Sequence, residues 1–467
     1  MSITFTERIK NILRAGEVLP PPSVGVHHFL RSDDHSKTRL HLRVEADGKG
    51  LLLINAARAL HLNSTATHMA FWALSNFPTA QIIRSISSLY QVPGNQAKTD
   101  YAQFSASLEE LILPDGGCPI CDLELDSIAP FSAMPSAPYR MDLALTYRCN
   151  NNCSHCYNAR SRQYPELSTA EWKRVIDLLW QLGIPHIVFT GGEPTLRDDL
   201  PELIAHAEGL GQITGINTNG RRLKDPAFLQ SLVQAGLDHI QITLESHDAA
   251  IHNRMVAASN AWQDTVEGIS NAVASNLYIM TNTTLLVENS KYLRETLNFL
   301  ANLKVPTVGL NALIYSGRGE QVGTGLAEED LPALLEIARE RTNAAGQRLI
   351  WYTPTQYCHF DPILLDLGVK GCTAALYNMC VEPDGAVLPC QSYYTSLGNI
   401  LADPWQSIWE HPLALSLRNR TNVPAACQAC AFLSECGGGC PLAPQSPRPP
   451  STFATHPAHP LSLEVIK

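Results

Sequence analysis

The sequence predicts an α/β protein built around a partial TIM-like barrel of about six strand–helix units. From residue 141 onward, short apolar runs alternate with segments of helical periodicity. Repeated units of this kind imply a parallel sheet with right-handed crossovers. The runs with strand character are Met141–Thr146, His186–Thr190, Gln212–Asn217, His239–Leu244, Tyr278–Leu286 and Thr307–Leu313.

Helical segments fall between these runs. The first follows Ser168-Thr-Ala-Glu171, the pattern of a capping box, and others begin near Asp198, Asp225, Ala261, Ser290 and Glu328. In a parallel barrel the reacting groups lie at the carboxyl ends of the strands. The most distinctive residues follow the first four strands: Cys149 to Cys156, Gly191 to Pro194, Asn217 to Gly220, and Glu245 with Ser246. We therefore expect the reactive site at this end of the barrel.

Composition narrows the class of protein. With 467 residues, 45% hydrophobic and 17% charged, the chain is an ordinary globular one of about three domains. Its 34 basic residues against 44 acidic ones argue against a nucleic-acid surface. The N-terminal stretch lacks the apolar core of a signal peptide, and no apolar run is long enough to cross a membrane. We expect a cytoplasmic protein, in which thirteen cysteines indicate metal binding rather than disulfides.

A different pattern occupies residues 24–116. Leu40–Val44 and Leu51–Asn55 predict two short strands, and three helices with polar caps follow, opening near Ser64, at Thr79 and at Asp100. This combination predicts a small winged-helix-like module of the α+β class. Residues 1–23 before it read as a short amphipathic segment that ends in prolines.

Three cysteines stand together after the first barrel strand: Cys149, Cys153 and Cys156. Gaps of three and then two residues fit neither helix nor strand periodicity, so a loop must aim the three sulfurs at one point. A structural zinc site needs a fourth ligand close by, and the next cysteine is Cys358. Three thiolates with one open position suit an iron–sulfur cluster that binds a further molecule.

This Cys-x3-Cys-x2-Cys loop resembles that of the radical S-adenosylmethionine (SAM) enzymes. The resemblance implies that Cys149, Cys153 and Cys156 hold three irons of a 4Fe–4S cluster, whose fourth iron chelates SAM. An electron, supplied by a reductant such as flavodoxin or ferredoxin, would cleave SAM to a 5′-deoxyadenosyl radical, which takes hydrogen from an unactivated carbon. His155 stands where the family has an aromatic residue near the adenine. The alternatives are a zinc knuckle or three free thiols.

Further cofactor contacts follow from the same resemblance. Gly191-Gly192-Glu193-Pro194 needs bare backbone at a tight turn, where main-chain carbonyls can approach an ammonium group. It resembles the family's Gly-Gly-Glu-Pro motif, which binds the amino group of SAM, and in isolation it would be a plain turn. Positions that relatives use around SAM are Asn219, Glu245 and Ser246, and also Arg254, Asn289 and Arg318, for which salt-bridge or capping roles are the alternative.

The N-terminal module has a resemblance of its own. Leu51–Thr65, followed by Ile82–Ile86 and a tyrosine, looks like the PqqD-like recognition element of ribosomal-peptide maturases. The resemblance implies that the leader of a precursor peptide adds as an extra strand to an exposed sheet edge. The alternative is a winged helix that reads DNA. Its recognition helix would be Thr79–Tyr90, which has one arginine and no lysine, so we do not expect nucleic acid as a partner.

Eight cysteines lie between residues 358 and 440: Cys358, Cys372, Cys380, Cys390, Cys427, Cys430, Cys436 and Cys440. The spacings Cys-x12-Gly-x4-Cys and Cys-x2-Cys-x5-Cys-x3-Cys resemble the SPASM extension of radical SAM enzymes, which holds two auxiliary 4Fe–4S clusters. The resemblance implies a first cluster on Cys372, Cys390 and Cys440, with Cys358 or Cys380 as the fourth ligand. Cys427, Cys430 and Cys436 would hold the second. A zinc ribbon is the alternative.

The last cysteine of the SPASM pattern is absent, because residues 441–467 contain none. The second auxiliary cluster then has three open answers for its fourth position. These are His456 or His459, a direct substrate contact, or a rearranged set that uses Cys380 or the pair Cys118 and Cys121. That Cys-x2-Cys pair also fits a redox pair, or two thiols in a structural turn.

The predicted order of parts is a segment 1–23, the recognition element 24–116, a linker 117–137, the radical SAM barrel 138–352, the cluster domain 353–442 and a proline-rich tail 443–467. The predicted function is oxidative modification of a ribosomally made precursor peptide, as a thioether, a carbon–carbon crosslink or a backbone excision. The sequence identifies no catalytic acid or base.

Three rival functions remain open at this point. One is a maturase of a folded protein of the sulfatase type, and another is a tetrapyrrole-modifying enzyme. The third is a metal-binding winged-helix regulator, which would have no need for Gly191 to Pro194 beside Cys149.

Overall fold

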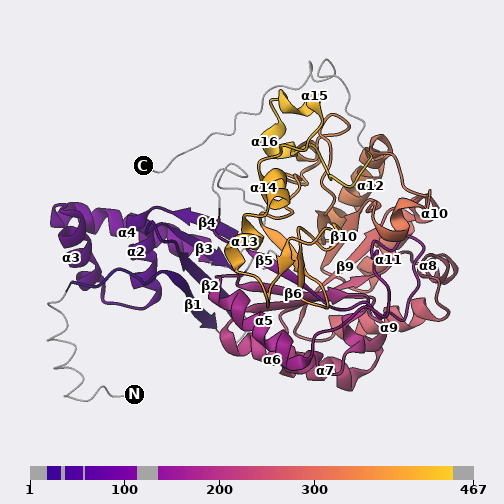
Figure 1. Ribbon diagram of the computed structural model, residues 1–467, viewed down its shortest axis with the longest axis horizontal. Coiled ribbons are helices and arrows are strands. Elements are labelled where there is room, and N and C mark those ends of the chain that lie inside the picture. Colours follow the sequence, from indigo (N-terminus) through magenta and orange to yellow (C-terminus); the bar gives the residue numbers. More distant parts are fainter. Residues whose placement is uncertain (1–17, 33–36, 56–57, 113–134, 445–467) are drawn as a thin grey trace. The chain divides into compact units, whose positions relative to one another are not determined.

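The computed structural model describes residues 18–32, 37–55, 58–112 and 135–444 (Figure 1). The chain divides into two compact units, Met1–Ile128 and Ala129–Lys467. Cys118, Cys121, His456 and His459 fall outside the described residues. Within the described part, no helix combines the length and the apolar character needed to span a bilayer.

The N-terminal unit is a four-stranded antiparallel sheet covered by three helices. The strands lie in the order β1 (Gly25–Ser32), β2 (Lys37–Val44), β3 (Gly50–Ile54) and β4 (Arg58–Leu62). The helices are α2 (Ser64–Leu74), α3 (Thr79–Tyr90) and α4 (Gly94–Ile112). Leu40 and Leu42 of β2 and Leu52 of β3 are buried in one cluster with Leu74 of α2 and Leu108 of α4. Alternate residues of each strand thus form the core beneath the helices.

The sequence predicts only two strands here, and the structure adds β1 and β4. β1 reads Gly-Val-His-His-Phe-Leu-Arg-Ser, with no alternation of apolar and polar residues to mark it. The third helix begins at Gly94 rather than at the predicted Asp100. A polar cap for α3 is also wrong, since Pro78 precedes that helix and makes no side-chain hydrogen bond to it.

The six predicted barrel strands are confirmed as one parallel run. They are β5 (Arg140–Thr146), β6 (His186–Gly191), β7 (Ile213–Thr218), β8 (His239–Thr243), β9 (Tyr278–Thr284) and β10 (Thr307–Asn311). β11 (Arg348–Trp351) pairs parallel to β10, and β12 (Asn378–Val381) pairs parallel to β5. β13 (Ala386–Leu388) and β14 (Gly398–Asn399) continue from β12 as antiparallel strands. The cluster region therefore extends the same sheet.

Helices α5 to α12 lie between the strands along the chain, and α13 to α16 follow β14 (Figure 1). They are α5 (Thr169–Gln181), α6 (Leu200–Leu210), α7 (Pro226–Gln234), α8 (Ala249–Val256), α9 (Ala261–Val273), α10 (Val287–Ser290), α11 (Leu293–Asn302), α12 (Leu331–Ala344), α13 (Trp405–Trp409), α14 (Pro412–Arg418), α15 (Ala425–Gln428) and α16 (Leu433–Cys436). Short 3-10 helices are η1 (Pro194–Leu196), η2 (Arg221–Lys224), η3 (Gly317–Glu320), η4 (Glu328–Asp330) and η5 (Ile363–Leu365). The capping box at Ser168 and Glu171 is present, and α8 is a helix that the sequence does not predict.

The core of this unit lies between the strands and the helices that follow them. Leu143 of β5, Ile187 and Phe189 of β6 are fully buried together with Trp172 of α5 and Leu203 of α6. Strands of a parallel sheet that are covered by helices read as continuous apolar runs, as these do. The core therefore fixes the strands and leaves their carboxyl ends to carry the polar loops described next.

Candidate functional site

The distinctive loops meet at one edge of the sheet, as the sequence predicts. β5, β6, β7 and β8 are consecutive neighbours. The cysteine loop follows β5, and Gly191 ends β6 with Gly192 directly after it. Asn219 follows β7, and Glu245 lies two residues after β8. Parallel neighbours bring their carboxyl ends together, so four loops that are distant in sequence become one site.

The cysteine loop is attached to the end of α8. Asn152 and Ser154 donate their amides to the carbonyls of Val256 and Met255, at 2.8 and 3.0 Å. These two backbone hydrogen bonds fix a loop that has no regular secondary structure of its own. The sequence does not reveal this attachment, because α8 itself carries no strong helical pattern.

Three arginines hold the carbonyl groups of the same loop. Arg162 donates to the Cys149 carbonyl at 2.7 Å, and Arg221 donates to the Asn150 carbonyl at 2.8 Å. The amide of Arg318 donates to the Cys156 carbonyl at 2.9 Å, and its guanidinium donates to Asn152 Oδ1 at 2.6 Å. The arginines satisfy the loop backbone, and the charge of Arg162 opposes part of the rise in the pKa of Cys149. Arg162 and Arg221 are functional candidates that the sequence pattern does not mark.

The three thiols lie close enough to influence one another. Burial raises the pKa of Cys149 to about 11, with the Glu193 carboxylate and Cys156 adding to the effect. Burial also raises the pKa of Cys153 well above its usual value, and Cys156, Glu245 and Cys149 act in the same direction. None of the three is in a disulfide. The raised pKa values disfavour thiolates at this loop. Binding of a metal centre, which displaces the thiol protons, would offset that cost.

The donor set fits a cluster better than a single ion. Among residues 18–32, 37–55, 58–112 and 135–444, no three His, Cys, Asp or Glu side chains converge as ligands of one metal ion. Cysteines that each bind a different iron of a cluster do not need to converge that closely.

Gly191 and Gly192 are required by the approach of the neighbouring strand. A Cβ on Gly191 would lie 2.1 Å from the Thr146 carbonyl oxygen, and one on Gly192 would lie 2.3 Å from that of Arg148. Gly191 also has φ +132°, a conformation that favours glycine. The amides of Gly192 and Glu193 donate to the Thr146 and Arg148 carbonyls, at 2.6 and 2.8 Å. The glycines thus lock the second loop against the start of the cysteine loop.

Glu193 is a buried carboxylate that joins β6 to β7. It is 1% exposed, and its Oε1 accepts from the hydroxyls of Thr195 and Thr218 at 2.7 Å each. Its Oε2 accepts from the Asn219 amide at 2.8 Å. Burial raises the pKa of Glu193, and these hydrogen bonds oppose that rise. Hydrogen bonds hold both carboxylate oxygens, so the Glu193 side chain orients the loop that follows β6.

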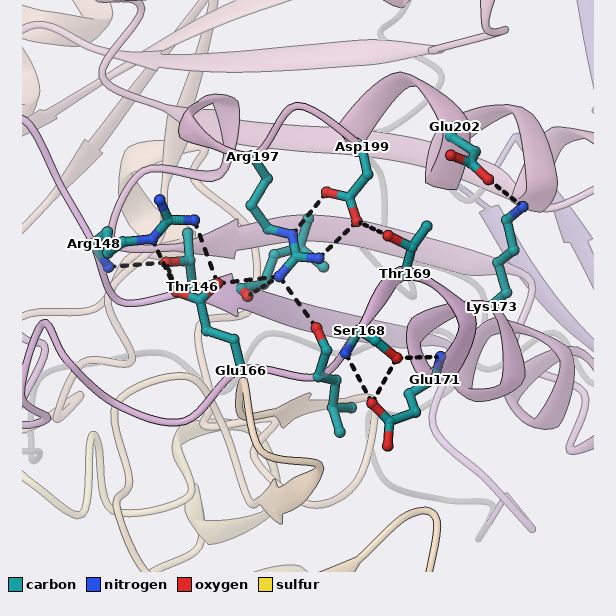
Figure 2. A network of polar contacts seen from close by, with 12 residues as sticks. Thr146, Arg148, Glu166, Ser168, Thr169, Glu171, Lys173, Arg197, Asp199 and Glu202 are labelled. Atoms are coloured by element: carbon teal, nitrogen blue, oxygen red, sulfur yellow. Dashed lines mark hydrogen bonds and ion pairs between the residues drawn. The ribbon is translucent and has the colours of Figure 1, made fainter.

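Figure 2 shows how the ends of β5 and η1 are tied together. Arg197 lies between Asp199 and Glu166, with its nitrogens 2.6 and 3.2 Å from their carboxylate oxygens. Glu166 also accepts from the Thr146 hydroxyl at 2.5 Å. Burial lowers the pKa of Arg197, but its two carboxylate partners outweigh that effect. A single buried guanidinium therefore couples the loop after Pro194 to the strand that precedes Cys149.

His155 faces Glu245 across the site. Its Nε2 lies 2.9 Å from Glu245 Oε1, and Oε2 of the same carboxylate accepts from the Thr284 amide at 2.9 Å. Burial lowers the pKa of His155, yet the attraction of Glu245 leaves it raised overall. In the described part of the chain, the buried Nδ1 of His155 has no hydrogen-bond partner. An unpartnered polar atom beside three free thiols indicates room for a polar ligand.

Other residues that the family resemblance suggests have structural partners. Asn219 Nδ2 donates to Asn150 Oδ1 at 2.6 Å, at the rim of the cysteine loop. The Ser246 hydroxyl accepts from the Asp248 amide at 3.1 Å, in the turn before α8. Asn289 donates to the Glu245 and Thr284 carbonyls, at 2.8 and 2.9 Å. Asn219 lies within the site, whereas Ser246 and Asn289 shape the backbone that carries Glu245.

Seven of the eight later cysteines form two sets. One consists of Cys372, Cys390 and Cys440, since the last two each raise the pKa of Cys372 after burial does. The other contains Cys358, Cys427, Cys430 and Cys436, whose mutual effects are of the same kind. Cys380 is fully buried among Ala144, Tyr147 and Leu388.

Contacts within the second unit join the first loop to the cluster region. The Tyr157 hydroxyl donates to Gln391 Oε1 at 3.3 Å, which connects the neighbours of Cys156 and Cys390. Arg160 makes two bonds, of 2.7 and 2.9 Å, to the fully buried Glu382. These contacts add to the pairing of β5 with β12, which joins the two cysteine regions in one sheet. Nothing in the spacing of the sequence pairs Arg160 with Glu382.

Comparison with known families agrees with this geometry. The family model described as Radical SAM superfamily matches residues 143–300, and the SPASM model, an iron-sulfur cluster-binding domain, matches residues 372–431. The matched ranges contain the cysteine loop and most of the later cysteines.

Curated relatives share about a quarter of their residues with this chain. An Fe-coproporphyrin III synthase of Methanosarcina barkeri is 28% identical over 324 residues, which cover 63% of this chain and 81% of that protein. A PqqA peptide cyclase of Xanthomonas euvesicatoria is 28% identical over 326 residues, covering 67% of this chain and 84% of that protein.

Solved structures show the same fold. Streptococcus suis SuiB bound to its precursor peptide SuiA has a TM-score of 0.64 at 17% identity, over 89% of this chain and 95% of SuiB. The structure of anSMEcpe with AdoMet and a peptide has a TM-score of 0.51 at 16% identity, over 64% of this chain and 89% of that one. The predicted fold class is therefore confirmed. The chain is a radical SAM enzyme with a SPASM domain, and enzymes of this kind use S-adenosylmethionine and 4Fe–4S clusters.

Proposed function

We propose that this enzyme modifies a ribosomally made precursor peptide, whose leader binds the N-terminal unit. The observation that carries the proposal is the antiparallel sheet of that unit. Its outer strands β1 and β4 each pair with one neighbour only in the described part of the chain. An open strand edge offers unpaired amides and carbonyls, which can bind an extended peptide as a further strand.

The likeness to SuiB supports the same proposal. Residues 129–467 make up less than three quarters of the chain, so a match over 89% of it includes part of the N-terminal unit. The matched structure contains a precursor peptide. A module shared with a peptide-binding enzyme, and ending in open edges, favours a peptide over a small molecule.

The residues at the barrel edge fit the proposed chemistry. Cys149, Cys153 and Cys156 would hold the cluster that binds SAM, and Gly191 to Pro194 would present backbone to its amino group. When bound, this cofactor supplies the 5′-deoxyadenosyl radical. His155 offers its unpartnered Nδ1 to the cofactor and is oriented by Glu245. Glu193 acts as a positioning residue, because its oxygens are already bonded to the loops of β6 and β7.

A second candidate function is the modification of a tetrapyrrole. Its support is that an Fe-coproporphyrin III synthase and two AdoMet-dependent heme synthases are among the curated relatives, at 26 to 28% identity. Those matches cover 63 to 66% of this chain. The match to the PqqA peptide cyclase has nearly the same coverage, 67%, so the choice depends on the strand edges, for which a tetrapyrrole has no use.

The test compares the two substrates directly. The anaerobically reconstituted enzyme would be given dithionite, SAM and either the peptide encoded by a small neighbouring reading frame or iron coproporphyrin III. We expect 5′-deoxyadenosine formation to rise with the peptide. Mass spectrometry should show loss of two hydrogens for each crosslink, or loss of a larger fragment for an excision. Stimulation by the porphyrin alone would refute the proposal and favour the second candidate.

Proline substitution tests the role of the sheet edge. Neighbouring residues of an edge strand turn their amides alternately toward the sheet and away from it. Of Leu60→Pro and His61→Pro in β4, one should therefore lower the melting temperature, and the other should leave it unchanged. If the leader binds at β4, the variant with the unchanged melting temperature should bind a fluorescent precursor peptide more weakly. Proline substitutions at two neighbouring residues of β1 should have no such effect.

A further inference from the structure

The second set of late cysteines contains one member from far upstream in the chain. Cys427, Cys430 and Cys436 lie within ten residues, on α15, α16 and the turn between them. The Cys430 amide donates to the Cys427 carbonyl at 3.0 Å, and Leu433 donates to Cys430 at 3.2 Å. These bonds close successive tight turns, which keep the three cysteines within one short compact segment. Three thiolates bind three of the four irons of a 4Fe–4S cluster, so one position stays open.

The segment that ends in Cys358 lies directly against these turns. The amide of Tyr357 donates to the Cys436 sulfur at 3.4 Å, and the same sulfur lies 3.5 Å from the Thr355 carbonyl. Cys358 directly follows Tyr357, whose amide contacts the Cys436 sulfur, and consecutive Cα atoms are only about 3.8 Å apart. The segment that ends in Cys358 therefore lies next to a member of the second set.

Two further contacts hold the segment that ends in Cys358 in this position. Gln356 Nε2 donates to the Gly438 carbonyl at 3.3 Å. Gly439 has φ +77°, and a Cβ there would lie 2.7 Å from Gln356 Cγ. Only glycine allows the two segments to approach this closely. Gly439, directly before Cys440, is therefore required for the close approach of residues 355–356.

The contacts place this segment with the second set. Thr355 and Tyr357 both meet the sulfur of Cys436, which belongs to that set.

We propose that Cys358 is the fourth ligand of the cluster held by Cys427, Cys430 and Cys436. This assignment differs from the family pattern, in which an upstream cysteine joins the first auxiliary cluster. It gives the second cluster four cysteines, the usual complement of a closed 4Fe–4S site. Cys372, Cys390 and Cys440 then remain as the described ligands of the first. The proposal does not depend on which substrate the enzyme modifies.

The test measures iron in a protein that lacks the SAM cluster. Cys149, Cys153 and Cys156 are all changed to alanine, so that the full chain should bind about eight irons in two auxiliary clusters. In this background Cys358→Ala would have one of two results. The second cluster fails to assemble, which costs about four irons, or it assembles and loses about one iron on mild oxidation with ferricyanide. The second case would appear as a new [3Fe–4S] signal in electron paramagnetic resonance. Ser434→Ala, an exposed substitution in α16, is the matched control and should keep all the iron.

Double substitutions decide which cluster Cys358 serves. Residues that act in one cluster should be non-additive, and residues in different clusters additive. We expect Cys358→Ala with Cys436→Ala to lose no more than Cys436→Ala alone. With Cys372→Ala, the change at Cys358 should cost additional iron. The reverse pattern, or a Cys358→Ala variant with unchanged iron and spectrum, would overturn the assignment.

A serine variant covers the case in which alanine prevents folding. Cys358→Ser keeps an oxygen donor at the same place, and both clusters should assemble. If Cys358 is a ligand, the spectrum and midpoint potential of one cluster change. If both stay as in the background protein, Cys358 is not a ligand and the proposal fails. Neither measurement uses catalytic activity, so failure of the proposed peptide function would leave the result intact.

Discussion

Gly192→Ala is predicted to disrupt the site by steric overlap alone. The new Cβ would lie 2.3 Å from the Arg148 carbonyl oxygen and 2.6 Å from that of Tyr147. Both atoms belong to the backbone, and neither can rotate away. Because carbon and oxygen atoms rarely come closer than about 3 Å, one of the two segments has to move by roughly 0.7 Å. The segment that moves is the one that leads into Cys149, or the one that carries Glu193.

The expected cost can be estimated from the same contacts. Overpacking in a rigid site costs about 1–3 kcal/mol. The amide bonds from Gly192 and Glu193 to this backbone, at 2.6 and 2.8 Å, would stretch, at about 1 kcal/mol for each bond that is lost. We therefore expect the catalytic unit to lose about 2–4 kcal/mol of unfolding free energy. The free energy of iron binding by the cysteine loop should fall by more than the free energy of unfolding does, because the displaced Arg148 carbonyl directly precedes Cys149.

The assay is anaerobic calorimetry together with iron content and 5′-deoxyadenosine formation. Gly209→Ala is a matched control, because a Cβ at this position in α6 meets nothing within 4 Å. Alanine there should raise stability slightly, by about 0.5–1 kcal/mol, as in other helices. If Gly192→Ala unfolds like the unchanged protein and still cleaves SAM, the two loops are not locked together and this reasoning is wrong.

Three other predictions concern the folded unit. Burial lowers the pKa of His239 to about 3. Because the unfolded chain binds a proton near pH 6.5 and the folded one does not, stability is complete above that pH and should fall by about 2 kcal/mol between about pH 6.5 and 5, a slope that His239→Asn flattens in urea titrations. Arg160→Ala leaves the buried Glu382 carboxylate unpaired, so we expect a loss of about 3 kcal/mol in denaturant melts, against less than about 1 kcal/mol for the half-exposed Arg148→Ala. Ser168→Ala removes a helix cap and should cost about 1 kcal/mol, visible as a lower melting temperature.

Local patterns account for what the sequence predicts well. The six barrel strands are continuous apolar runs, and each is separated from the next by a helix of clear periodicity. The cysteine loop and Gly191 to Pro194 depend on residue types at short spacing, and topology alone then places them together. The expectation that the site lies at the carboxyl ends of the strands was therefore available before any coordinates.

Contacts between distant segments account for what the sequence does not predict. β1 and β4 lack a period of two and are strands because β2 and β3 provide partners. Arg162 and Arg221 reach the cysteine loop from other elements, and no spacing marks them. Cysteine spacing likewise cannot tell which thiols share a cluster. Cys358 is 14 residues from Cys372 and much further from Cys427, yet it docks beside the second set.

The separation between the cysteine loop and the cluster region depends on the hydrogen-bond ladder of three neighbouring strands. β5 lies between β6 and β12, with Thr146 opposite Gly191 and Asp142 opposite Cys380. Cys380 in turn pairs with Leu388 of β13, two residues before Cys390. A shift of one residue anywhere in this ladder would move every side chain of the strand to the opposite face.

Side-chain contacts such as Tyr157 with Gln391 only add to this arrangement. Their removal should change stability by about the value of one hydrogen bond, without changing the distance between the two centres. A substitution that alters this distance must therefore act on the backbone of β12, β5 or β6. For the same reason the SPASM region cannot be treated as an independent domain, because its first strand is a strand of the barrel sheet.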